Sequence, residues 1–232
     1  MTDASPVGRV YLVGAGPGDV GLLTLRAVEC LQQADFVLYD YLTHPRTLDY
    51  ARPEAERFKV TRLPGTHAER WPLITARVIE EARKGRVVVH LKGGDPLVFG
   101  RGAEEAEALR AAGIPYEIVP GVTAAFAAGA CAEIPLTHRA CASAVALVTG
   151  HEEPGKAAGL DWDALTRFPG TLAVYMGVTQ LGHIVHELVS RGTNPDTPAA
   201  LVYRASAGEQ RTVTAALGKL EGKVREAGVG RP

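Results

Sequence analysis

The sequence has few cysteines, and their arrangement excludes two classes of protein. Its 232 residues include three, Cys30, Cys131 and Cys141, an odd number with neither a CxxC pair nor a mixed Cys and His spacing. The seven histidines show no metal-ligand spacing either. A disulfide framework and a metal site are therefore not expected, and the pattern favours buried thiols in a reducing compartment, with the cytoplasm as the default.

The sequence also lacks a charge excess and a long apolar run. It has 25 Lys and Arg residues against 26 Asp and Glu residues, a net charge of -1, so no overall field attracts nucleic acid or an anionic membrane. The weakly polar run 122–132 is too short to span a bilayer, and residues 1–9 lack the apolar core of a signal peptide. With 46% apolar residues to build its core, the chain is expected to be a soluble protein without nucleic-acid or membrane partners.

Short β-branched runs alternate with helical patterns along the first half of the chain. The patterns predict strands at 9–13, 36–39, 58–60, 86–91 and 116–119, and helices at 22–33, 73–83 and 103–112. This alternation implies right-handed crossovers and a mostly parallel sheet with helices on both faces. In such a sheet, ligands bind beyond the carboxyl ends of the strands.

Pro120 and Gly121 interrupt this rhythm, and a second α/β pattern follows. It predicts helices at 122–130, 181–191 and 214–227, and strands at 144–149, 172–176 and 199–203. The predicted fold class is α/β, with one domain over residues 1–118, a second over 119–232, and the ligand in a cleft between them. After the last helix one more strand is expected, and the sequence ends before it.

Residues 92–104, KGGDPLVFGRGAE, are the most unusual stretch of the chain. Glycines and a proline directly follow an apolar strand, next to the charged residues Lys92, Asp95, Arg101 and Glu104. Glycine admits positive φ and lets backbone approach a ligand closely, so we interpret this stretch as a binding loop, the KGGD loop. A glycine-rich turn between strand and helix is the simpler alternative.

A second glycine-rich stretch, GAGPGD at residues 14–19, lies where a dinucleotide fingerprint would lie, and we call it the GAGPGD loop. Asp19 replaces the third glycine of that fingerprint, and its carboxylate would repel a pyrophosphate at a helix N-terminus. Asp40 lies where a ribose-binding acid would, so an NAD-dependent oxidoreductase stays open. The Lys-Ser/Thr of a P-loop is absent. An adenosyl ligand that carries positive charge fits these loops better.

Further blocks follow in order over residues 8–213: VYLVGAGPGD at 10–19, VLYD at 37–40, LKGGDPLVFGRG at 91–102, VPGVTA at 119–124, IPLTHR at 134–139, VTGH at 148–151 and YMG at 175–177. Together they resemble the uroporphyrinogen-III C-methyltransferases of the tetrapyrrole methylase superfamily. The first block and GGDP recur across that superfamily, whereas FGRG with Glu104 and PLTHR narrow the resemblance to the uroporphyrinogen enzymes.

The resemblance implies a two-domain α/β homodimer that binds S-adenosylmethionine between its domains. It further implies methylation of uroporphyrinogen III at C2 and C7, through precorrin-1 to precorrin-2, for sirohaem or cobalamin. By block position, the implied cofactor-binding residues are Pro17, Gly93, Gly94, Asp95, Val98, Thr123, Ala124, Met176 and Ala205. Gly93 and Gly94 would let backbone groups meet the cofactor, and Asp95 would hold its ammonium or ribose hydroxyls. Val98 and Met176 would form apolar walls, although core packing is the alternative for both.

The substrate carries carboxylates on its acetate and propionate arms, so its pocket needs guanidinium groups that pair with them. Arg101 and Arg139 are the first choices, with Glu104 positioning Arg101 or accepting from pyrrole N–H groups. Weaker candidates, each with a solvated or otherwise satisfied side chain as the alternative, are Arg62, His67, His138 and Arg204.

The reaction needs no protein nucleophile, because a pyrrole carbon of the reduced macrocycle attacks a sulfonium that is already a good leaving group. The methylated ring must then lose a proton, and the resemblance points to Asp40 as the acceptor. The family's paired Lys falls on Arg62, whose guanidinium rarely gives up a proton, so the donor role does not transfer simply. A later precorrin methyltransferase and a non-catalytic adenosyl-nucleotide sensor also stay open.

Overall fold

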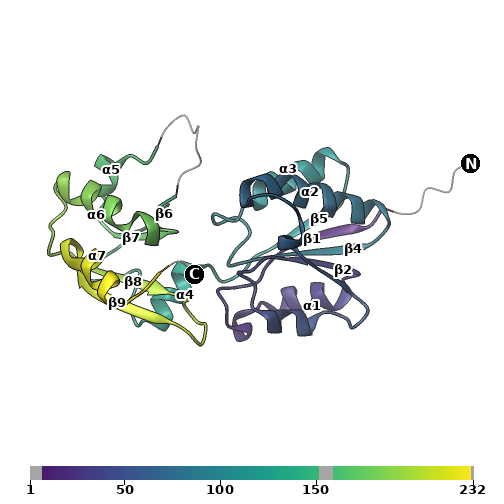
Figure 1. Cartoon of the computed structure of the whole chain (residues 1–232), viewed down its shortest axis with the longest axis horizontal. Coiled ribbons are helices and arrows are strands. Elements are labelled where there is room, and N and C mark those ends of the chain that lie inside the picture. The colour runs from purple at the N-terminus through teal and green to yellow at the C-terminus, as the bar shows by residue number, and fades with distance from the viewer. Residues whose placement is uncertain (1–6, 152–158, 231–232) are drawn as a thin grey trace, which may run out of the picture. The chain divides into compact units, whose positions relative to one another are not determined.

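The computed structural model describes residues 7–151 and 159–230. They form two compact units, one ending at Thr123 and the other beginning at Ala124 (Figure 1). Among the described residues, no helix is long and apolar enough to cross a membrane.

The first unit is built on a five-stranded sheet in the order β3-β2-β4-β1-β5. Its strands are β1 (Arg9–Gly14), β2 (Phe36–Tyr39), β3 (Glu56–Lys59), β4 (Val87–Lys92) and β5 (Tyr116–Val119). Every pairing is parallel, which confirms the predicted sheet. Because Gly14 is in register with Lys92, the GAGPGD and KGGD loops leave the sheet from neighbouring strand ends.

Helices cover both faces of this sheet, and each face has its own apolar core. Helix α1 (Leu25–Gln33) packs on one face through buried Ala27 and Leu31. Helices α2 (His67–Arg83) and α3 (Gly102–Ala111) lie on the other face, as Figure 1 shows. The central strands β1, β2 and β4 are consequently buried on both sides, as expected for a doubly covered parallel sheet. Short 3-10 turns join the elements at Val20–Leu22, Pro45–Tyr50 and Val60–Arg62.

Helix α2 begins well before its predicted start at Leu73. The side chain of Thr66 accepts from the Glu69 N–H at 3.4 Å, and the Glu69 carboxylate accepts from the Thr66 N–H at 2.6 Å. This reciprocal capping box fixes the helix start ahead of Pro72, which lies inside the helix. The added N-terminal stretch brings Trp71 into the helix.

The second unit contains two separate two-stranded sheets. Strands β6 (Val145–Thr149) and β7 (Thr171–Tyr175) pair in parallel, and β8 (Pro198–Tyr203) and β9 (Arg211–Ala216) form an antiparallel pair. The helices of the unit are α4 (Ala124–Cys131), α5 (Trp162–Thr166), α6 (Leu181–Ser190) and α7 (Leu217–Glu226), with a 3-10 turn at Val178–Gln180. Its small core centres on Ile184, Leu188 and Leu217.

Two sequence predictions are wrong in detail. The predicted helix 214–227 begins at Leu217, because residues before it pair with β8, with Val213 opposite Leu201. The thiols are not all buried: Cys30 is, and its burial raises the pKa of its thiol to about 11, whereas Cys131 and Cys141 are exposed.

Candidate functional site

The two glycine-rich loops of the first unit are joined to each other where β1 and β4 end. The Gly16 N–H donates to the Gly94 carbonyl at 3.2 Å, and the Gly94 N–H donates to the Gly16 carbonyl at 2.8 Å. Both residues have positive φ, 71° and 70°. The backbone polar groups of Gly94 therefore serve this bridge, and what Gly94 offers a ligand is the absence of a side chain.

A third backbone segment, which follows β5, packs against this bridge without space for side chains. A Cβ built on Gly121 would lie 2.2 Å from the Gly94 carbonyl oxygen, and one on Gly14 would lie 2.5 Å from the Gly121 nitrogen. Asp95 ties the same segments together: its Oδ1 accepts from the Leu97 N–H at 2.8 Å and its Oδ2 from the Gly121 N–H at 3.0 Å. Each carboxylate oxygen accepts more than one hydrogen bond, so Asp95 can also receive a ligand donor.

Asp40 directly follows β2 and is held by one of its two carboxylate oxygens. Oδ1 accepts from the Leu42 N–H at 2.9 Å, the Thr43 N–H at 3.1 Å and the Thr43 hydroxyl at 3.3 Å. Among the described residues, none donates a hydrogen bond to Oδ2. The carboxylate is thus fixed in orientation while one oxygen stays open to a proton or a ligand.

Arg62 lies at the carboxyl end of the neighbouring strand, because β2 and β3 pair with Tyr39 opposite Lys59. It ends the 3-10 turn Val60–Arg62, and its guanidinium carbon lies 5.9 Å from the centre of the Phe58 ring. The arginine is exposed. Asp40 and Arg62 therefore belong to the same edge of the sheet.

Arg101 occupies an unusual backbone position at the end of the KGGD loop. Its φ of 57° and ψ of 22° are left-handed, as is the φ of 54° at Phe99. Such conformations are uncommon for residues other than glycine and cluster at functional loops. The Arg101 Nε lies 3.4 Å from Glu104 Oε1, and the guanidinium carbon lies 4.7 Å from the centre of the Trp71 ring.

A buried charged network lies directly beneath this loop, and the sequence reasoning missed it. The Lys92 ammonium donates to Glu105 Oε1 at 2.8 Å, and Glu105 Oε2 lies 3.0 Å from His90 Nδ1. All three side chains are buried. Burial pushes the pKa of Glu105 upward, but the charges and hydrogen bonds of His90 and Lys92 outweigh it and hold that pKa below its usual range.

A sequence signal for this network existed. His90 and Lys92 alternate with Val89 and Leu91 along β4, so two basic side chains share one face of an otherwise apolar strand. A buried ammonium requires a counter-charge. The adjacent pair Glu104 and Glu105, at the start of the next helix, supplies it.

The remaining predicted residues of the first unit lie near the same strand ends. Pro17 and Val98 are half-buried in the GAGPGD and KGGD loops, and Thr123 is buried after β5. A Cβ on Gly93 would lie 2.9 Å from Leu42 Cβ. The side chain of His67 lies outside the described residues.

The second unit holds the other predicted residues. Met176 follows β7 with a φ of 55° and is 53% exposed, whereas Ala205 is buried and Ala124 is exposed at the start of α4. Arg139 is exposed in a turn that His138 closes by hydrogen bonds with Ala142. Arg204 has left-handed backbone and pairs with Glu209. The predicted cleft, which combines residues of both units, stays a prediction.

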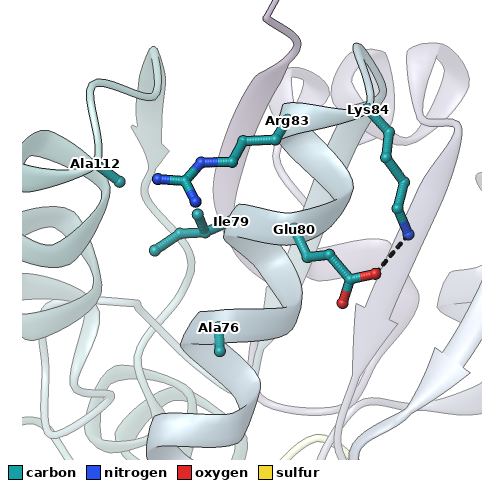
Figure 2. A pocket seen from close by; sticks show the side chains of 6 residues that line it. All are labelled: Ala76, Ile79, Glu80, Arg83, Lys84 and Ala112. Carbon is teal, nitrogen blue, oxygen red and sulfur yellow. Dashed lines mark hydrogen bonds and ion pairs between the residues drawn. The ribbon is translucent and has the colours of Figure 1, made fainter.

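Two surface hollows lie elsewhere. One, with a volume of about 550 Å³, lies on the C-terminal half of α2. Figure 2 shows the side chains that line it, Ala76, Ile79, Glu80, Arg83, Lys84 and Ala112. Among them, the Lys84 ammonium pairs with the Glu80 carboxylate at 2.7 Å. The other, of about 400 Å³, lies beyond the end of β6 and is lined by Thr149, Gly150, Leu160, Trp162, Gln180 and His183. Neither contains a predicted site residue. Within residues 7–151 and 159–230, no cluster of His, Cys, Asp and Glu could hold a metal ion.

Comparison with known proteins identifies the family. The profile of the Tetrapyrrole (Corrin/Porphyrin) Methylases matches residues 9–221. A uroporphyrinogen-III C-methyltransferase from Priestia megaterium is 45% identical over 97% of this chain and 95% of its own length. The chain spans about half the length of the siroheme synthases that it also matches; one from Gluconacetobacter diazotrophicus is 48% identical over 100% of this chain and 49% of its own length.

Solved structures of similar fold agree with this family match. The uroporphyrin-III C-methyltransferase from Thermus thermophilus, complexed with S-adenosylhomocysteine, has a TM-score of 0.79 and 42% identity over 97% of this chain and 94% of its own. A cobalt precorrin-4 methyltransferase of cobalamin biosynthesis has a TM-score of 0.83 and 31% identity over 95% of this chain and 90% of its own. The fold is that of a tetrapyrrole methylase. The chain belongs to the tetrapyrrole (corrin/porphyrin) methylase family.

Proposed function

We propose that this protein transfers methyl groups from S-adenosylmethionine to carbon atoms of uroporphyrinogen III. The observation that carries the proposal is the union of the GAGPGD and KGGD loops at the carboxyl ends of β1 and β4, with Arg101 directly beside them. Family membership and the 45% identical uroporphyrinogen-III C-methyltransferase support it.

The cofactor side of the proposal rests on loops whose backbones pack directly on one another. Gly14, Gly94 and Gly121 meet backbone on backbone, so these three residues place no side chain over the ends of β1 and β4, where we place the adenosyl ligand. Asp95 is fixed between two loops and has acceptor capacity for an ammonium or a ribose hydroxyl. The full proposed set is Pro17, Gly93, Gly94, Asp95, Val98, Thr123, Ala124, Met176 and Ala205.

The substrate side uses arginine. Arg101 and Arg139 bind carboxylate arms of the macrocycle, and Glu104 holds Arg101 through its 3.4 Å contact. Asp40 accepts the proton that the methylated ring loses, through the Oδ2 that its own loop leaves open. Arg62 acts as a fixed positive charge near that carboxylate rather than as a proton donor.

The proposed product is precorrin-2, formed through precorrin-1 by methylation at C2 and then C7, in the cytoplasm. The proposed assembly is a homodimer, so light scattering of the purified protein should give about twice 24.5 kDa. A monomer with full turnover would contradict the dimer but leave the activity standing.

The deciding experiment supplies uroporphyrinogen III and S-adenosylmethionine under anaerobic conditions and follows the product by mass and absorbance. We expect a gain of two methyl groups and one S-adenosylhomocysteine per transfer. The Asp40→Asn variant serves as the matched control, because it should bind both ligands and turn over slowly. Calorimetry with S-adenosylhomocysteine and with NAD separates a methyltransferase from an oxidoreductase, and binding without transfer would indicate a sensor.

A later precorrin methyltransferase is the second candidate, favoured by the TM-score of 0.83 with a cobalt precorrin-4 methyltransferase. That reading predicts no transfer to uroporphyrinogen III but transfer to an already methylated precorrin. Running both substrates side by side distinguishes the two.

A further inference from the structure

Trp71 of α2 lies against two positively charged side chains. The Lys92 ammonium is 5.1 Å from the centre of its ring, and the Arg101 guanidinium carbon is 4.7 Å from it. Both distances are within the range of a cation–π interaction. Lys92 is buried, whereas the Arg101 side chain is 34% exposed, so the ring links the interior of the unit to the rim of the loop.

The buried side of this arrangement is fixed. Glu105 pairs with the Lys92 ammonium at 2.8 Å and contacts His90 at 3.0 Å, and all three side chains are buried. A buried ammonium that left its carboxylate would lose its only strong compensation for desolvation, so Lys92 stays in place. The Trp71 ring therefore contacts an ammonium group whose position is fixed.

The rim side is constrained as well. Arg101 has left-handed backbone, and the next residue, Gly102, packs closely against Pro96. The Gly102 N–H donates to the Pro96 carbonyl oxygen at 2.9 Å, and a Cβ added to Gly102 would lie 2.5 Å from that oxygen. The contact with Glu104 at 3.4 Å is long and uses only Nε. A guanidinium has five N–H donors, so its outer fork remains for a ligand, while the ring face limits how the plane can turn.

We propose that Trp71 is a positioning residue that holds the Arg101 guanidinium in one orientation for a carboxylate of the tetrapyrrole. The inference rests on the proposed function, and it adds a specificity element from α2, a helix without an assigned site residue. Without the ring, Arg101 keeps its charge but samples many orientations, and the cost of ordering it falls on substrate binding. Cofactor binding does not involve this contact.

The test compares KM for uroporphyrinogen III, kcat, and S-adenosylhomocysteine affinity in Trp71 variants. We expect Trp71→Ala to raise KM about tenfold, with kcat and cofactor affinity within about twofold of the parent. Trp71→Phe should retain most of the parent KM because it keeps an aromatic face. Trp71→Leu, which keeps apolar bulk without a ring face, should behave like Trp71→Ala and replaces it if the alanine variant does not fold. Leu73→Ala, at an exposed position of the same helix, should leave KM unchanged.

A double-mutant cycle shows whether the effect runs through Arg101. In an Arg101→Ala background, Trp71→Leu should change KM by less than about twofold, since the group it positions is gone. An equal rise in KM in both backgrounds, or an unchanged KM in Trp71→Leu alone, would overturn the positioning role while the methyl transfer of the parent protein stood. A parent protein that transfers no methyl group to uroporphyrinogen III would overturn both proposals.

Discussion

Replacing Glu105 with glutamine should destabilise the first unit strongly. Glu105 is 2% exposed, and its carboxylate is the counter-charge of the ammonium of Lys92, a residue that is 6% exposed. Glutamine keeps the shape but leaves that ammonium buried without a negative charge, a change that typically costs about 3–5 kcal/mol. The Trp71 ring at 5.1 Å offsets part of this loss, because a desolvated cation–π contact is worth about 2 kcal/mol. We therefore expect a loss at the low end of this range, about 3 kcal/mol. This is a large share of the free energy of unfolding of a typical domain, roughly 5–15 kcal/mol.

Urea unfolding followed by tryptophan fluorescence measures this change locally. The chain has two tryptophans, and in a Trp162→Phe background Trp71 reports on the first unit alone. The matched control is Glu104→Gln, one residue earlier on the same helix, whose long exposed contact with Arg101 contributes at most about 0.5 kcal/mol. Combining Glu105→Gln with Lys92→Met removes both charges and should restore much of the lost stability. A Glu105→Gln effect no larger than that of Glu104→Gln would refute the buried ion pair.

The same carboxylate predicts a pH dependence with a definite sign. Burial raises the pKa of Glu105, but His90 and Lys92 lower it by more, so the folded-state pKa lies below the ordinary value of 4.5. Its contribution to stability is then fully present above pH 4.5 and is lost as the pH falls through the lowered folded-state pKa. Unfolding midpoints measured from pH 7 to pH 3 should fall more steeply for the parent than for Glu105→Gln. Parallel curves would contradict this assignment.

Five further substitutions test the site itself. Asp40→Asn should lower kcat about 10- to 1000-fold with both ligand affinities nearly intact, whereas parent-rate turnover would assign the proton to water. Arg62→Lys in the parent protein should hold or raise that rate, and a large loss would show that the guanidinium itself is required. Arg101→Ala and Arg139→Ala should each weaken uroporphyrinogen binding by about 2–4 kcal/mol with S-adenosylhomocysteine affinity unchanged, and the reverse pattern would move them to the cofactor side. Gly94→Val should weaken S-adenosylhomocysteine binding by at least about 2 kcal/mol. Because Gly94 has a φ of 70°, the substitution should also lower the unfolding midpoint. An unchanged calorimetric affinity would remove Gly94 from the cofactor site.

The sequence predicted the first unit best because β1, β2 and β4 are largely buried and rich in apolar residues. The strands 36–39 and 116–119 begin and end where they were predicted. Helix α2 was harder, since Pro72 is usually read as a boundary and the Thr66 capping box overrides it. Strand β9 was missed because the predicted helix was begun at Thr214. Thr212, Val213 and Thr214 are β-branched residues that favour a strand, and their pairing with β8 makes the segment extended.

The sequence pointed to the two loops of the candidate site, but not to the contacts that hold these loops in place. The spacing of the glycines was enough to find the GAGPGD and KGGD loops in the sequence. The backbone bridge between Gly16 and Gly94, however, depends on the register of β1 and β4. The network of His90, Lys92 and Glu105 depends likewise on where α3 lies over β4, which no local pattern specifies. Trp71 lies ahead of the helix predicted at 73–83, and its two charged partners come from β4 and the KGGD loop, so no local pattern singled it out.

Strand β4 explains why cofactor and substrate elements lie together in this unit. Beyond its carboxyl end, Gly94 joins the GAGPGD loop, which is the proposed cofactor side. On the face under α2 and α3, its Lys92 is fixed by Glu105 and in turn supports Trp71 and Arg101, the proposed substrate side. A backbone shift of β4 would therefore displace both sides at once. The buried charges cost desolvation that an apolar pair would avoid, so we explain their presence beneath this loop by the rigidity that they give to the strand shared by both proposed ligand sites.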